Sequence, residues 1–145
     1  MLKEFIEQQS EIKEKVECLS SIKGVGFVTS IALLASVPEL GTLSRRVVSS
    51  LAGVAPMNQD SGKYKGKRRI QGGRHMARKA LYMAALVASQ KNPAFREFYQ
   101  RLLKRGKPAK VVLTAIMRKL VCLANKLLQI LAQKHPENNS QVVFP

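Results

Sequence analysis

The chain has 145 residues, of which 46% are apolar, so it is long enough and apolar enough to form one domain with a modest core. Its 25 Lys and Arg residues outnumber 9 acidic residues and give a net charge of +16, which indicates a polyanionic partner: nucleic acid first, an anionic membrane surface second. No apolar run reaches the roughly 18–20 residues of a membrane span, there is no signal-peptide core, and two Cys with two His lack zinc-ligand spacing.

Residues 2–19 are predicted to form an amphipathic helix that holds five of the nine acidic residues, so the basic character belongs to the rest of the chain. Because this segment is polar outside its apolar stripe, it needs a partner. We therefore expect residues 1–20 to be the end of a coiled-coil linker, followed by a helical domain over 21–134 and a tail over 135–145. The near-heptad stripe consists of Leu2, Phe5, Ile6, Gln9, Ile12, Val16 and Leu19.

Residues 19–37 are predicted to form two short helical pieces around Lys23-Gly24-Val25-Gly26, a pattern that fits a helix-hairpin-helix. The glycines allow positive φ and close approach of a phosphate, Val25 would fill the core beneath the turn, and the amides of Gly24 and Gly26 would point outward beside a helix N-terminus. Such contacts recognise nucleic-acid backbone and not sequence. We assign these four residues to nucleic-acid binding; the alternative is a plain connection between two helices.

A short helix over 44–52 is predicted next, and then a Gly-rich loop over 54–73 with a possible short hairpin at 64–70. The segment 60–79 is strongly basic and has no acid after its first residue. Tyr64 could stack on a base or sugar, and a phosphate contact or a neutral surface role is favoured for His75 over acid–base chemistry. The alternative is a solvated face, but we predict nucleic-acid contact for the basic residues Lys63, Lys65, Lys67, Arg68, Arg69, Arg74, Arg78 and Lys79.

Ser61 lies between Asp60 and Gly62 at the start of this basic run. A serine that attacks a phosphodiester needs cations to stabilise the developing charge and a group that accepts its proton. Nearby Arg and Lys residues could meet the first need. On the residues alone, however, Asp-Ser-Gly is more often a turn in which a side chain bonds its own backbone, so local chemistry favours the turn.

Three longer helices complete the chain, over 74–90, 92–106 and 107–134. The middle one has Asn92 as N-cap, Pro93 at its first position and Gly106 at its C-terminal cap. No alternating apolar run is long enough for a sheet, so the sequence predicts an all-α fold. The apolar stripe of the last helix includes Val112, Ile116, Leu120, Leu123, Leu127 and Leu131, and the cysteines Cys18 and Cys122 occupy apolar positions typical of reduced, buried thiols.

With one Asp and most of its Glu in the first helix, the chain cannot form a two-metal nuclease site unaided. The stretches 22–37, 51–88 and 92–120 together resemble the C-terminal domain of the insertion-sequence 110/116/902 transposase family, which includes bridge-RNA-guided recombinases. The resemblance covers about residues 1–132, and 53–88 is its most specific part.

This resemblance implies that Ser61 is the nucleophile that joins DNA covalently, and that the basic loop and the turn hold DNA or guide RNA. Family members are similar in having an N-terminal RuvC-like domain with acidic ligands for Mg²⁺, and in assembling as dimers and tetramers. This chain contains no such domain and no cofactor site of its own, so we expect no recombination from it alone. The resemblance implies a bacterial, cytoplasmic, nucleoid-associated protein.

Two alternatives stay open at this point. The chain could be a stand-alone, non-catalytic helix-hairpin-helix module that binds DNA or RNA, in which case Ser61 would be dispensable. It could also be a coiled-coil oligomerisation domain whose charge is incidental, in which case binding to nucleic acid would not respond to salt.

Overall fold

The computed structural model describes residues 2–54 and 74–134, with side chains from residue 9 onward. These residues form helices and connecting turns without any strand, so the predicted all-α fold is confirmed for them. The predicted hairpin at 64–70 and the tail over 135–145 lie outside the described residues. The helices are α1 (Leu2–Ser20), α2 (Phe27–Ser36), α3 (Arg45–Leu51), α5 (His75–Lys91), α6 (Pro93–Lys104) and α7 (Ala109–Lys134).

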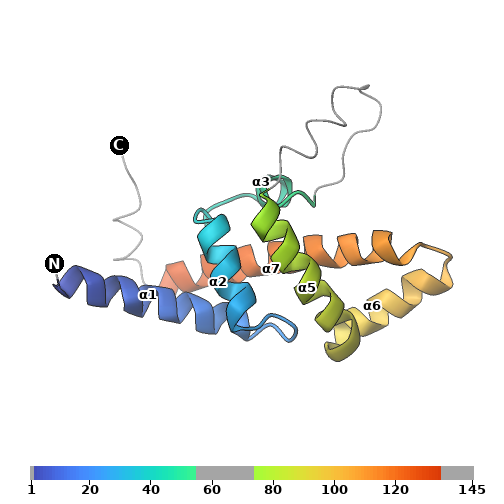
Figure 1. Ribbon diagram of the computed structural model, residues 1–145, viewed down its shortest axis with the longest axis horizontal. Coiled ribbons are helices and arrows are strands. Elements are labelled where there is room, and N and C mark those ends of the chain that lie inside the picture. The colour runs from blue at the N-terminus through green and yellow to red at the C-terminus, as the bar shows by residue number, and fades with distance from the viewer. Residues whose placement is uncertain (1, 55–73, 135–145) are drawn as a thin grey trace, which may run out of the picture.

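Helix α7 forms the centre of the fold, because α1, α3, α5 and α6 all pack against it (Figure 1). Helix α5 crosses α7 and also contacts α2 and α6. Its buried face is rich in alanine, and small side chains let neighbouring helices approach closely. The core of α5 and α7 includes Ala77, Leu81, Ala84, Ala85, Ala88, Val112, Ile116, Leu120, Val121, Ala124 and Leu128.

The apolar stripe predicted for α7 is partly wrong. Val112, Ile116 and Leu120 are buried as predicted, but Leu123 is 36% exposed. Val121 and Leu128, which the predicted stripe does not include, are buried. The reason is that the buried face of α7 continues from Leu120 in steps of four residues, through Ala124 to Leu128, whereas the predicted stripe moves to Leu123 after Leu120.

Among the described side chains of helix α1, those of Val16 and Leu19 in its C-terminal half are buried in the core. Ile12, which belongs to the predicted stripe, is 49% exposed, and Figure 1 shows the N-terminal half of α1 extending past the end of α7. Two short helical pieces were predicted on either side of residues 23–26, and the first of them is the end of α1, which runs to Ser20 and is followed by a turn. The coiled coil stays a prediction.

Helix α6 begins and ends at the residues that the sequence indicates. The Asn92 side chain accepts a hydrogen bond from the Ala94 amide at 3.2 Å, and Pro93 is the first helical residue. At the other end Gly106 has φ +86°, and the Lys107 amide donates to the Leu102 carbonyl at 3.2 Å, which closes the helix in a Schellman motif.

Candidate nucleic-acid interface

The turn between α1 and α2 is held against the N-terminal end of α6 and the C-terminal half of α5. Val25 is buried and its amide donates to the Ile22 carbonyl at 2.9 Å, so the prediction that Val25 fills the core is confirmed. Gly24 has the predicted positive φ, +112°, and a Cβ there would lie 2.8 Å from the Ala88 Cβ. The side-chain Nδ2 of Asn92 also donates to the Lys23 carbonyl at 3.0 Å. Gly24 is therefore required for helix packing, independently of any ligand.

Gly26 differs from Gly24 in conformation and in surroundings. It is the N-cap of α2 with an extended backbone (φ −93°, ψ −174°), and no atom lies within 4 Å of where its Cβ would be. No side chain caps the helix there, and the exposed neighbours are Lys23, Phe27 (67%) and Val28 (78%). This end of α2 is open to solvent and has the cation Lys23 nearby, so an anion could bind there. Phosphate binding at the turn stays a prediction.

The two ends of the segment 55–73 lie close together in the fold. The Arg74 amide donates to the Leu51 carbonyl at 2.8 Å, and the Arg78 guanidinium donates to the Gly53 carbonyl at 2.7 Å. Seven predicted site residues lie outside the described residues, and nothing in the fold places them: Ser61, Lys63, Tyr64, Lys65, Lys67, Arg68 and Arg69.

Arg74 has a partner within the chain. Its guanidinium donates two hydrogen bonds of 2.7 Å to the two carboxylate oxygens of Glu39 and a third, of 2.9 Å, to the Ser36 carbonyl. The hydrogen bonds from Arg74 hold the pKa of Glu39 at about 2, below its ordinary 4.5. Arg74 was predicted to contact nucleic acid; the structure gives it a structural partner, and a contact with nucleic acid stays a prediction. Sequence reasoning missed Glu39, although it is the only acid between Glu17 and Asp60.

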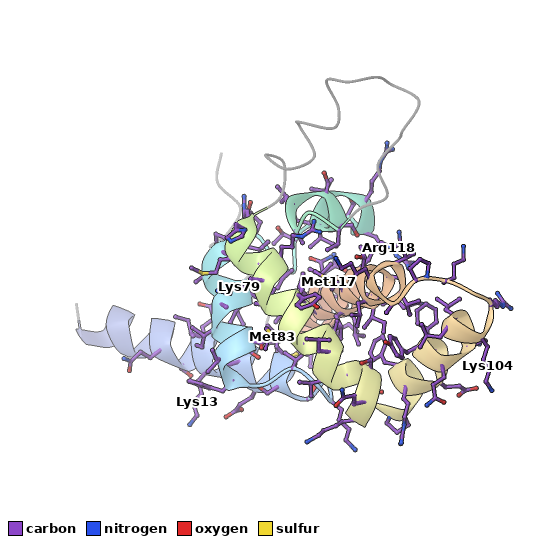
Figure 2. All side chains as sticks on the ribbon, turned by 45° about the vertical axis from the view of Figure 1, so that its right-hand side comes forward. Lys13, Lys79, Met83, Lys104, Met117 and Arg118 are labelled. Atoms are coloured by element: carbon purple, nitrogen blue, oxygen red, sulfur yellow. The ribbon has the colours of Figure 1, made fainter. Side chains whose placement is uncertain are left out.

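A groove with a volume of about 390 Å³ lies between α5 and α7. It brings together three predicted residues, His75, Arg78 and Lys79, whose spacing places them on one face of α5. Figure 2 shows Lys79 on α5 and Met117 on α7, the neighbouring helix. None of the described residues that line the groove is acidic; they are His75, Arg78, Lys79, Tyr82, Lys110, Thr114 and Met117. We call this surface the α5/α7 groove.

The α5/α7 groove offers the chemistry that a sugar–phosphate backbone needs. Lys79 and Lys110 are cations on its two walls. The Thr114 hydroxyl also lines the groove, and its proton is donated to the Lys110 carbonyl at 2.9 Å. Tyr82, 43% exposed, presents a ring that can stack on a base or sugar. Tyr82 was missed, although it follows Arg78 by one helical turn. Lys110 lies 31 residues after Lys79 in the chain, so no local pattern connects it with α5.

Two further findings apply to the described part of the chain. No three His, Cys, Asp or Glu side chains gather there in a way that could bind a metal ion. None of its helices is both long enough and apolar enough to cross a bilayer.

Comparison with known proteins places these features in a family. Residues 16–100 match the model of the transposase IS116/IS110/IS902 family. The chain is similar to the pilin gene-inverting proteins of Moraxella bovis and Moraxella lacunata, each 32% identical over 123 residues that make up 82% of this chain and 38% of the relative. It is also 28% identical, over 136 residues, to the insertion element IS900 42 kDa protein of Mycobacterium paratuberculosis, covering 91% of this chain and 34% of the relative.

The chain thus spans little more than a third of the length of these relatives. The family match covers more than half of the chain and includes the turn, α2, α3, α5 and most of α6. The chain belongs to the transposase IS116/IS110/IS902 family.

Proposed function

We propose that this chain is the nucleic-acid-binding part of a DNA transposase or recombinase, and that it binds the sugar–phosphate backbone in the α5/α7 groove. The observation that carries the proposal is the groove itself, in which cations of α5 and α7 face one space without a described acid. The family match and the names of the Moraxella proteins, which invert a pilin gene, support a role in DNA rearrangement.

The groove favours backbone contact over base reading. Lysine ammonium groups neutralise phosphates as point charges, whereas reading a base edge needs paired donors and acceptors at fixed positions. Of the two arginines at this end of α5, Arg74 is bound to Glu39 and Arg78 donates to the Gly53 carbonyl. The free cations of the groove are therefore suited to binding many sequences alike and to strong dependence on salt.

We also propose that Ser61 is the nucleophile of strand exchange. The support is the family membership together with the ends of the segment that carries it, since Leu51 and Arg74 are hydrogen-bonded beside the α5/α7 groove. In this reaction the serine Oγ would give its proton to a base and form a bond to a backbone phosphorus, and one sugar oxygen would leave that phosphorus and take up a proton. Neighbouring cations would offset the negative charge that develops on the phosphate. Mg²⁺ would be held by a RuvC-like domain, a structured guide RNA would select the site, and the active form would be a dimer or tetramer.

Binding to duplex DNA tests the groove. The double variant Lys79→Gln/Lys110→Gln removes one cation from each wall, and the matched control Lys13→Gln/Lys104→Gln removes two exposed lysines from α1 and α6 (Figure 2). We expect the groove variant to bind more weakly at every sequence and to reduce the slope of log affinity against log salt by about two. Equal slopes for the groove variant and the control would refute the groove, and a flat response of the unmodified protein would refute nucleic-acid binding altogether.

A further inference from the structure

A second groove, with a volume of about 490 Å³, lies between α3 and α7. Its walls carry Arg45 from the first turn of α3 and Lys119 and Lys126 from α7, and none of the described residues that line it is acidic. We call it the α3/α7 groove. Lys119 and Lys126 are seven residues apart, so they lie two turns apart on one face of α7.

The two grooves lie on different sides of α7. Lys110 of the α5/α7 groove and Lys119 of the α3/α7 groove are nine residues apart, and at about 100° per residue their side chains leave the helix in opposite directions. The second wall also differs, since it is α5 in one groove and α3 in the other. A single straight backbone segment in one groove therefore leaves the cations of the other without a phosphate.

The floor of the α3/α7 groove is fixed by buried polar contacts. Asn125, only 4% exposed, accepts from the Gly41 amide at 2.7 Å and donates to the Leu43 carbonyl at 2.8 Å. Gln129 donates to the same Leu43 carbonyl at 3.0 Å. These contacts hold the chain before α3 against α7, so that Arg45 and Lys126 are presented from supports that do not need to rearrange on binding.

The positive surface continues from this groove onto α6. The Lys119 ammonium lies 4.6 Å from the centre of the Phe98 ring, and the Arg101 guanidinium lies 5.7 Å from the same ring. Phe98 therefore orients two cations at the edge of the groove through cation–π contacts.

We propose that the α3/α7 groove binds a second nucleic-acid backbone segment, separate from the one in the α5/α7 groove. The inference rests on the proposed function, because it takes nucleic acid to be the polyanionic partner that the net charge of +16 indicates. Phosphates suit this groove because its lining is cationic and its floor is held by hydrogen bonds. The chain then holds two nucleic-acid segments, one on each of two sides of α7. A protein that brings separate strands together needs two such binding sites.

Cys122 gives a local reporter, because it lines the α3/α7 groove and its sulfur lies 3.4 Å from the Ser49 hydroxyl. Cys18 is the internal reference: its thiol donates to the Leu127 carbonyl at 3.7 Å, and burial raises its pKa. We expect saturating duplex DNA to slow maleimide alkylation of Cys122 several-fold and to leave Cys18 unchanged. Unaltered alkylation of Cys122 under saturation by duplex DNA and also by structured RNA would overturn the inference.

Charge removal gives an independent measurement. Arg45→Gln/Lys126→Gln should reduce the salt slope by about two relative to Lys13→Gln/Lys104→Gln and remove the protection of Cys122, whereas Lys79→Gln/Lys110→Gln should keep that protection at saturation. A control-like slope for the Arg45/Lys126 variant refutes the second groove alone if the Lys79/Lys110 variant still loses slope. If neither groove variant differs from the control in its salt slope, both the second groove and the proposed function are refuted.

The same alkylation experiment with other polyanions identifies which molecule supplies the phosphates. Protection of Cys122 by structured RNA but not by duplex DNA assigns the groove to RNA, and protection by both assigns it to the shared backbone; either supports the inference. A polyglutamate peptide of equal charge serves as the non-nucleic polyanion. If it protects Cys122 as well as nucleic acid does, the groove selects charge alone and the assignment to nucleic acid is overturned.

Discussion

Gly24 and Gly26 lie two residues apart in one turn, but different physical requirements select them. Gly24 combines φ +112° with a close approach to Ala88, so an alanine there would cost roughly 2 kcal/mol or more from backbone strain and overpacking. Gly26 has open space and an extended backbone that other residues adopt. Only Gly26 can therefore be changed to ask whether the turn binds a phosphate, since a change at Gly24 would alter the fold as well.

Gly26→Asp separates the two roles of the turn. Asp is a favoured N-cap, so the variant should melt at the same or a higher temperature than the unmodified protein. If a phosphate sits at the N-terminus of α2, the added carboxylate should repel it and weaken DNA binding severalfold at low salt.

Gly26→Asn is the matched neutral cap, and band shifts of the two variants measure the charge effect alone. Equal affinities for Asp and Asn would mean that the turn is a connection between helices.

At the scale of elements, the Glu39–Arg74 pair ties the end of α2 to the start of α5. Both side chains are 37% exposed, so solvent screens the pair and its contribution is modest despite the bidentate geometry. The pKa of Glu39 in the fold, about 2, lies below its ordinary 4.5. The stabilisation is therefore complete above about pH 4.5 and is lost as the pH falls toward 2.

Glu39→Gln keeps the shape of the side chain and removes its charge. We expect its melting temperature to be lower than that of the unmodified protein at pH 7, and the difference to shrink between pH 4.5 and 2. Thermal melts followed by circular dichroism across this range measure it. A difference that stays constant with pH would show that the lost hydrogen-bond geometry, and not the ionised carboxylate, is responsible.

The helices could be predicted from sequence because their signals are local. Asn92, Pro93 and Gly106 set the ends of α6 within its own chain segment, and the composition of α5 and α7 is rich in helix formers. The grooves could not be predicted in the same way. His75 and Lys110, which line one groove, are 35 residues apart in the chain. The hydrogen bond from the Gly41 amide to Asn125, at the floor of the other groove, spans 84 residues. Each groove therefore depends on packing that no local pattern encodes.

At the scale of the whole molecule, the charges are separated by helix. The three helices that wall the two grooves, α3, α5 and α7, contain no acidic residue, whereas α1 holds most of the acids. The positive field is therefore concentrated around α7 and falls off toward the end of α1 that extends from the body (Figure 1). If the grooves bind nucleic acid as proposed, this asymmetry would orient the molecule with α1 pointing away from the nucleic acid.

The chemistry of Ser61 is proposed for a protein of the length of its relatives, of which this chain spans little more than a third. In a protein that joins this chain to a RuvC-like domain, Ser61→Ala should abolish the covalent protein–DNA adduct, because the variant lacks the hydroxyl oxygen that is proposed to attack. Affinity for DNA should stay within about twofold, since one neutral hydroxyl contributes little beside several phosphate contacts.

Ser50→Ala, at an exposed serine of α3, is the matched control and should leave the adduct intact. Adduct formation is read on denaturing gels with labelled DNA, and affinity by band shift in the same samples. An adduct that survives Ser61→Ala would assign the attack to another group while leaving both grooves in place. Loss of binding together with the adduct would instead make Ser61 a binding residue, because a nucleophile that only reacts does not hold its substrate.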